Sequence, residues 1–190
     1  MAKLQDVIDF FIEFYNSFDD ENDLTNLKLQ KLLYFAQGAH LAKTGELLFD
    51  EDIQAWRFGP VVPVAYEQYA DYGKKIIRQD LRACRESMSN DDLKTIVEIC
   101  NWGFSYTATA LVTKTHEPNS PWDVTFTDKK YSVIPTDVIQ RFFSEEGNAM
   151  PRVREIDFSQ MEKVKTSAEG YPILNRDEDP DEWSEYDHEF

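Results

Sequence analysis

The chain has 190 residues, a formal net charge of −16 and an aromatic share of 14%. This length is sufficient for one domain with a hydrophobic core. The acidic balance argues against nucleic acid as the direct partner, because proteins that bind nucleic acid neutralise phosphates with clustered Lys and Arg. It permits association with a basic protein, since complementary potentials orient and accelerate the encounter.

The cysteine positions and the N-terminal sequence indicate the compartment. Cys84 and Cys100 form no C-x-x-C pair, so we expect neither a zinc knuckle nor a disulfide framework, and we expect both thiols to be inert. Acidic residues at positions 6, 9 and 13 interrupt the segment where a signal peptide would need an uncharged apolar run. No apolar stretch approaches the roughly 18 residues of a membrane span. We therefore expect a reduced, cytoplasmic protein that does not engage a membrane.

Two helices are predicted in the first 45 residues. Residues 3–18 carry a continuous apolar stripe at helical spacing, and Phe10 and Ile12 lie off that stripe, so we expect this helix to be covered on more than one side. The second helix begins after Thr25, a residue typical of an N-cap, and stops at Gly45.

A short strand is predicted at 52–58, with both faces partly apolar. Its side chains alternate between one set, Ile53, Ala55 and Arg57, and a second set, Gln54, Trp56 and Phe58. Gly59-Pro60 is expected to end this strand, because Pro removes a donor from the hydrogen-bond ladder. Pro63 fits the first turn of a following helix, where its missing N–H costs nothing. This part of the chain therefore predicts a stiff strand-to-helix corner.

The remainder contains three more predicted helical segments, at 91–102, 107–113 and 135–143, and a turn-rich loop at 115–122. Residues 171–190 carry a net charge of −7 and are expected to be disordered when unbound. The predicted fold is thus mainly α with a short β element: a single compact helical domain over 1–150, containing the strand-turn-helix corner, followed by an acidic C-terminal extension over 151–190.

Motifs of common enzymes and cofactor sites are missing. The seven glycines are never closer than seven positions apart, so the sequence holds neither G-x-G-x-x-G nor a P-loop. It also lacks G-x-S-x-G and the H-x-x-x-H spacing of many zinc sites. We therefore expect no catalysis, no cofactor and no metal.

Three segments in order resemble one known family. They are L-K-L-Q-K-L-L-Y-F-A-Q-G (27–38), A-W-R-F-G-P-V-V-P-V-A-Y (55–66) and T-H-E-P-N-S-P-W (115–122). This set is similar to the Panacea (SocA-like) domain, formerly known as phage-associated protein GepA, and Ile134-Pro135 before a helix closes the match. The resemblance covers roughly residues 1–145.

The resemblance implies a mainly helical, non-catalytic antitoxin of a type II-like toxin–antitoxin pair. Relatives silence unrelated toxins by direct binding, among them translation inhibitors that modify nucleotides or tRNA, and many relatives are prophage-borne. One branch resembles a proteolytic adaptor that delivers its toxin to a Clp protease, which is a first alternative. The acidic tail lies outside the family motif. Lys28 comes too early to leave room for a preceding helix-turn-helix, so direct DNA binding is not expected.

A second alternative, from a different class, is an acidic phage-encoded inhibitor that mimics nucleic acid. Its inhibition would weaken steeply with added salt. The even dispersal of acidic residues before the tail favours this hypothesis less than the antitoxin.

Candidate partner-binding positions are the basic and aromatic residues of the three motifs and the aromatic residues of the tail: Lys28, Lys31, Tyr34, Trp56, Arg57, Phe58, Tyr66, Tyr69, His116, Trp122, Trp183 and Tyr186. Several have a simpler structural interpretation. Trp56 is expected to fill the domain's own core, although desolvated aromatic residues also dominate interfaces. The basic positions are expected to lie on a solvated or internally salt-bridged face.

Similar structural interpretations apply to the histidines and the tail. We expect His116 with Trp122 to brace the 115–122 loop, and His40 to be an interior histidine with hydrogen-bond partners. The tail is expected to be solvated. The functional alternative is a clamp in which its acidic and aromatic residues become ordered on a basic toxin.

Overall fold

A buried central helix, α2 (Asn26–Thr44), organises the fold in the computed structural model, which describes residues 1–18, 21–81, 83–127 and 131–145. As predicted, the Thr25 side chain accepts a hydrogen bond from the Lys28 N–H, and Gly45 ends the helix in the left-handed conformation with φ of 76°. Every residue from Lys28 to Leu41 is buried. Neighbouring elements therefore cover this helix on all sides.

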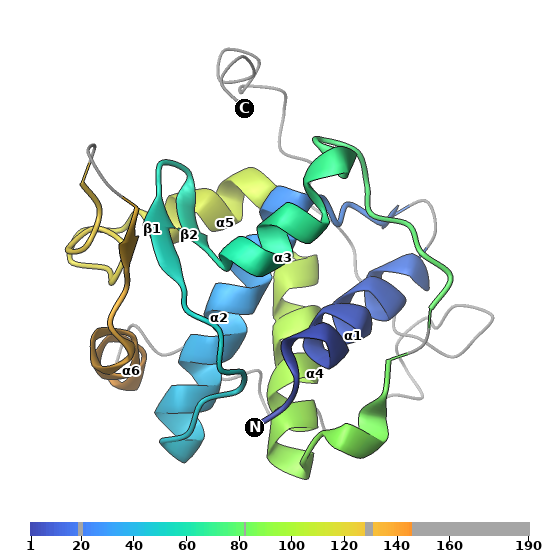
Figure 1. Ribbon diagram of the computed structural model, residues 1–190, viewed down its shortest axis with the longest axis horizontal. Helices are drawn as coiled ribbons and strands as arrows, with labels where there is room; N and C mark the ends of the chain where they lie inside the picture. Colours follow the sequence, from blue (N-terminus) through green and yellow to red (C-terminus); the bar gives the residue numbers. More distant parts are fainter. Residues whose placement is uncertain (19–20, 82, 128–130, 146–190) are drawn as a thin grey trace.

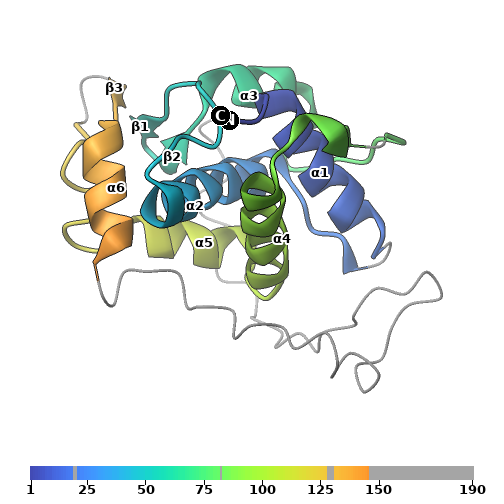
Figure 2. The ribbon, with the colours of Figure 1, turned by 90° about the horizontal axis from the view of Figure 1, so that it is seen from below.

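Four longer helices surround α2: α1 (Leu4–Asn16), α4 (Asn90–Phe104), α5 (Ala108–Thr115) and α6 (Thr136–Ser144). Seen from below, α6 lies on one side of α2 and α4 with α1 on the other (Figure 2). The small sheet and α3 (Pro63–Gln68) cover the front of α2, and α5 lies behind it (Figures 1 and 2). The prediction of a mainly α domain with a short β element is confirmed.

Local sequence explains how these helices begin and how they are covered. Ser89 and Asp92 form a reciprocal capping box at the start of α4, and Thr107 caps α5. Phe10 and Ile12 are both buried, which confirms that α1 is covered on more than one side. The predicted helices at 91–102, 107–113 and 135–143 are all present with slightly different bounds.

The helices pack closely because two glycines lie at their contacts. A Cβ on Gly38 of α2 would lie 2.4 Å from the ring of Phe143 in α6. A Cβ on Gly103 of α4 would lie 2.3 Å from the side chain of Leu32. Any side chain at either position would push two helices apart, because packed interiors have little spare volume.

His40 confirms the prediction of a satisfied interior histidine. It is buried in α2, with Nδ1 3.2 Å from the Thr95 hydroxyl and Nε2 3.4 Å from the Asp92 carboxylate. Burial lowers the pKa of His40, although the nearby charge of Asp92 acts in the opposite direction.

A three-stranded antiparallel sheet replaces the predicted single strand. Its order is β2-β1-β3, with β1 at Gln54–Trp56, β2 at Gly59–Val61 and β3 at Ser132–Val133. The prediction that Gly59-Pro60 ends the strand is therefore wrong, because both residues form part of β2. Pro60 is tolerated there because β2 is an edge strand. Pro63 does begin α3, as predicted.

Short 3-10 helices at Ala70–Tyr72 (η2) and Arg85–Ser87 (η3) complete the described fold. None of the helices in the described ranges is long and apolar enough to cross a membrane. The predictions for the extension 151–190, including disorder over 171–190, fall outside the described residues.

Candidate functional site

The three motifs converge on the hairpin formed by β1 and β2, whose turn is Arg57-Phe58. Trp56 pairs with Gly59 across this turn, and Gly59 has φ of 97°. Arg57 and Phe58 keep negative φ, so the positive φ at this turn is confined to Gly59, the residue type that adopts it most readily. Gly59 is also closely packed, since a Cβ there would lie 2.6 Å from the Thr115 hydroxyl.

Lys31 of α2 supports the hairpin from inside. Its side chain is fully buried and its Nζ donates a hydrogen bond of 2.9 Å to the Pro60 carbonyl oxygen. The ammonium group forms no ion pair with any residue that the structure describes, and burial lowers the pKa of Lys31 to about 7. Lys31 therefore has a structural role: its buried amine holds the Pro60 carbonyl in place, and no described carboxylate pairs with it.

The loop 115–122 supports the hairpin from a second side. Trp122 Nε1 donates a hydrogen bond of 2.7 Å to the Trp56 carbonyl oxygen. The His116 ring lies 3.6 Å from the Trp122 ring, and His116 Nε2 lies 3.4 Å from the Arg57 carbonyl oxygen. His116 and Trp122 therefore brace this loop, as predicted. We call Lys31, Thr115, His116 and Trp122 the hairpin frame.

Trp56 lies on the outer face of the sheet, so the expectation that it fills the core is wrong. Burial alternates along 52–56: Ile53 and Ala55 are buried, whereas Trp56 is only partly buried. Trp56 stacks on Tyr131 with ring centroids 4.6 Å apart, and the Tyr66 ring packs edge-on at 5.0 Å. We call Tyr66, Trp56 and Tyr131 the aromatic row.

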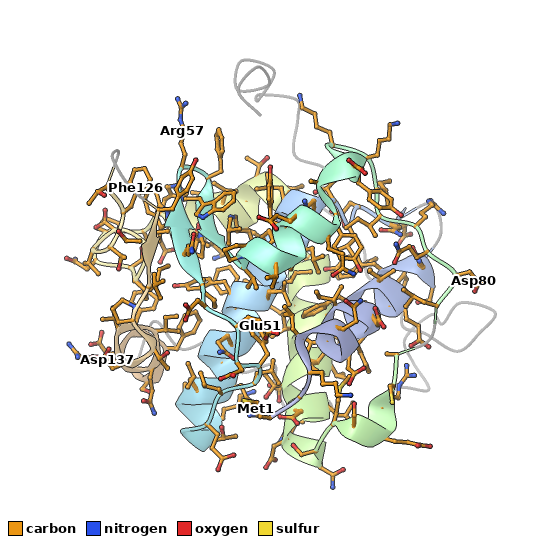
Figure 3. All side chains as sticks on the ribbon, in the orientation of Figure 1. Met1, Glu51, Arg57, Asp80, Phe126 and Asp137 are labelled. Atoms are coloured by element: carbon orange, nitrogen blue, oxygen red, sulfur yellow. The ribbon has the colours of Figure 1, made fainter. Side chains whose placement is uncertain are left out.

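Two further candidates lie at the hairpin tip. Arg57 is exposed and points away from the domain (Figure 3), with its guanidinium 5.7 Å from the Phe58 ring. Because the hairpin frame holds the backbone on both sides of these residues, the tip is fixed before any partner arrives. Arg57 and Phe58 therefore remain surface candidates.

Five of the candidate residues are buried inside the domain: Lys28, Lys31, Tyr34, Tyr69 and Trp122. A partner could reach them only if the domain opened. Lys31 belongs to the hairpin frame. Lys28 is fully buried and binds the Asp23 carboxylate at 2.7 Å, which matches the predicted internal salt bridge but not a solvated face. Tyr34 is buried, and burial, with the charge of Glu117, raises the pKa of its hydroxyl. Tyr69 is buried beside Gln5 and Gln68.

Trp183 and Tyr186 fall outside the described residues. The sequence interpretation missed Tyr131 and Val133, which are 61% and 44% exposed. Their strand could have been predicted from the sequence, because large apolar and small polar side chains alternate over 131–133 before the apolar Ile134. Val64 and Val124 are the other large apolar side chains exposed beyond the N-terminal Met among the described residues.

The exposed rings at the hairpin offer a surface for contact with another macromolecule. Among the described residues, no group of three or more His, Cys, Asp or Glu side chains is placed to hold a metal ion. Lys31, Thr115 and His116 lie near one another, but each is engaged with backbone oxygen atoms: Lys31 with Pro60, and both Thr115 and His116 with Val112. Rigid, partly exposed aromatic rings are instead typical of protein–protein contact surfaces.

Comparisons with known proteins match this region. The family model described as Antitoxin SocA-like, Panacea domain matches residues 29–123, which is half of the chain. A protein named Antitoxin SocA, from Caulobacter vibrioides (strain NA1000 / CB15N), is 35% identical over 112 residues, covering 53% of this chain. The chain spans 59% of the length of that relative. No solved structure matches the chain.

Proposed function

The chain belongs to the SocA-like antitoxin family defined by the Panacea domain, and on that basis we propose that it is the antitoxin of a two-gene toxin–antitoxin pair. The observation that carries this proposal is the family match over 29–123, which includes the whole hairpin frame and both strands of the hairpin. The relative named Antitoxin SocA supports the same role.

The proposed mechanism is direct binding in the cytoplasm. The antitoxin forms a complex with its cognate toxin and occludes the toxin's substrate site, without catalysis. Translation inhibitors that modify nucleotides or tRNA are the toxin class that the family resemblance suggests. A net charge of −16 favours fast encounter with a basic toxin. The aromatic row offers rings that lose little conformational entropy on binding, since ring contacts already order them.

A growth assay tests the proposal. The open reading frame beside this chain's gene is expressed alone and then together with this chain. We expect arrested growth in the first case, recovery in the second, and one complex when the two purified proteins are mixed. Continued arrest in the presence of excess, soluble chain contradicts the antitoxin role.

The two alternative mechanisms, a proteolytic adaptor and a nucleic-acid mimic, predict different results when the chain and its toxin are tested together. If the chain acts as a proteolytic adaptor, recovery depends on a Clp protease and the toxin's half-life shortens when the chain is present. If the chain mimics nucleic acid, inhibition falls steeply as the salt concentration rises. Occlusion predicts recovery in a strain that lacks the protease, with an unchanged toxin half-life.

A further inference from the structure

We propose that the aromatic row, with Asp52 and Glu67 beside it, is the surface that binds a basic segment of the cognate toxin. The inference rests on the proposed antitoxin function and adds to it the contact surface and the chemistry of the partner. The ligand groups that it assigns are Arg and Lys side chains, which lie over the rings and pair with the two carboxylates.

The rings are fixed before binding. Trp56 is held between Tyr131, stacked at 4.6 Å, and Tyr66, edge-on at 5.0 Å. Its indole Nε1 donates a hydrogen bond of 3.0 Å to the Gln54 side chain. The Tyr66 carbonyl oxygen accepts a hydrogen bond from Asn26 of α2, which anchors α3 beneath the row. The row therefore presents ordered rings from β1, from α3 and from the residue just before β3, and Tyr131 is its most exposed member.

Two carboxylates accompany this surface. Asp52 is exposed and lies two positions before Gln54, the first residue of β1, and four positions before Trp56. Glu67 is exposed and follows Tyr66 on α3. Neither carboxylate forms an ion pair or a side-chain hydrogen bond with another described residue. Both are therefore available to a cationic partner.

Aromatic faces and carboxylates together recognise cationic side chains. A guanidinium or ammonium group is attracted to the electron-rich face of Trp and Tyr, and Arg can pair with a carboxylate while stacking on a ring. The charge of the molecule favours the same partner, because the chain is strongly acidic and two of its cations, Lys28 and Lys31, are buried. Arg57 bounds this surface at the hairpin tip (Figure 3).

The partner is expected to lie across the face of the sheet. Addition of a strand at the β2 edge is disfavoured, because Pro60 has no N–H to donate to a new ladder. Binding across the face uses ring and carboxylate contacts, and its strength then depends on side-chain charge.

The first test maps the contact. The photoreactive residue p-benzoylphenylalanine replaces Tyr131 in the full chain, and the purified product of the adjacent reading frame serves as the partner. After illumination, mass spectrometry is expected to place the crosslink on a partner peptide rich in Arg and Lys. The same residue at Asp80, which lies on the opposite side of the molecule from Arg57 and Phe126 (Figure 3), is expected to give little product. A crosslink from position 131 to an acidic or uncharged peptide, or equal yield at both positions, overturns the proposal.

The second test measures charge dependence by calorimetry with the same partner. We expect the double substitution Asp52→Lys and Glu67→Lys to weaken binding about tenfold or more, whereas Asp80→Lys stays within about twofold of the wild type. Circular dichroism shows that each variant is folded. Wild-type affinity in the double variant overturns the docking surface but leaves the antitoxin role standing. A wild-type chain that neither binds the partner nor restores growth defeats both proposals.

Discussion

Gly59 meets two separate requirements at one position. Its φ of 97° is a conformation that L side chains rarely adopt, and the space for a Cβ is occupied by the Thr115 hydroxyl and by Lys31 Nζ, at 2.6 and 3.0 Å. The motif glycine therefore sets both the turn and its close approach to the hairpin frame.

Gly59→Ala is expected to lower the free energy of unfolding by about 2–5 kcal/mol, because backbone strain and overpacking add. Gly73→Ala is the matched control: Gly73 also has positive φ, at 53°, but nothing lies within 4 Å of its would-be Cβ. The control should lose only the backbone strain, about 1–3 kcal/mol. Urea denaturation measures both, and equal losses would show that the packing around Gly59 has no energetic weight.

Lys31 makes stability depend on pH. Its pKa is about 7 in the folded chain and 10.5 when unperturbed, so between these values the unfolded state binds more protons than the folded state. The free energy of unfolding should therefore rise with pH from about 7 to about 9, by ~1.4 kcal/mol per unit. As the pH approaches 9 an opposite effect begins, because burial raises the pKa of Cys100 above its unperturbed 9.0; the raised pKa of Tyr34 adds to it at higher pH.

Lys31→Met is expected to remove this pH dependence, because Met fills a similar space without a charge. Lys94→Met, at an exposed position on α4, should retain it. Urea titrations at several pH values between 7 and 9 give the slopes. A flat wild-type profile, or an unchanged slope in the Lys31 variant, would refute the burial of an uncompensated amine.

The burial of Lys28 and Lys31 could not be predicted from the sequence. Lys28 and Lys31 carry the chemistry of surface residues, and long charged side chains are rarely buried. Lys31 is buried because it reaches the Pro60 carbonyl, a partner 29 positions away. Only the fold brings such partners together, so spacing along α2 gave no sign of the hairpin frame.

At the scale of elements, the contact between α2 and α6 depends on Gly38. The ring of Phe143 occupies the position that a Cβ on Gly38 would need. Gly38→Ala should therefore destabilise the domain by about 1–3 kcal/mol, even though Ala favours helix formation. A smaller side chain at Phe143 should recover part of that loss.

The double substitution Gly38→Ala with Phe143→Leu tests this packing directly. We expect the two changes together to cost less than the sum of the single changes, because Leu leaves room for the new methyl group. Thermal or urea unfolding of the four proteins supplies the coupling energy. Strict additivity would mean that the two residues do not share the contact.

Helices were predicted well and strands poorly, for a physical reason. A helix is specified by neighbours in the sequence: Thr25 and Gly45 marked both ends of α2, and the apolar stripe located α1. A sheet depends on pairing between distant segments. β3 has only two residues and pairs with β1, some 77 positions away, so the short alternation along 131–134 was too brief to predict the pairing.

In the molecule as a whole, the residues of the family motifs mainly hold the hairpin in place, and fewer of them form an exposed contact surface. Lys31, Thr115, His116 and Trp122 hold the hairpin from within, while the aromatic row faces outward. Sequence predicted Trp56 and Tyr66 as binding candidates but could not separate them from interior residues such as Tyr34 and Tyr69. Burial, which follows from tertiary packing, makes that separation.

We expect the toxin to bind the outer face of the sheet, and hydrogen–deuterium exchange with and without the purified toxin measures this most directly. We expect slower exchange in the complex at 54–61, 64–67 and 131–134, with α4 unchanged. Slower exchange confined to α4 and η3, with the hairpin and β3 unaffected, would contradict toxin binding at the outer face of the sheet.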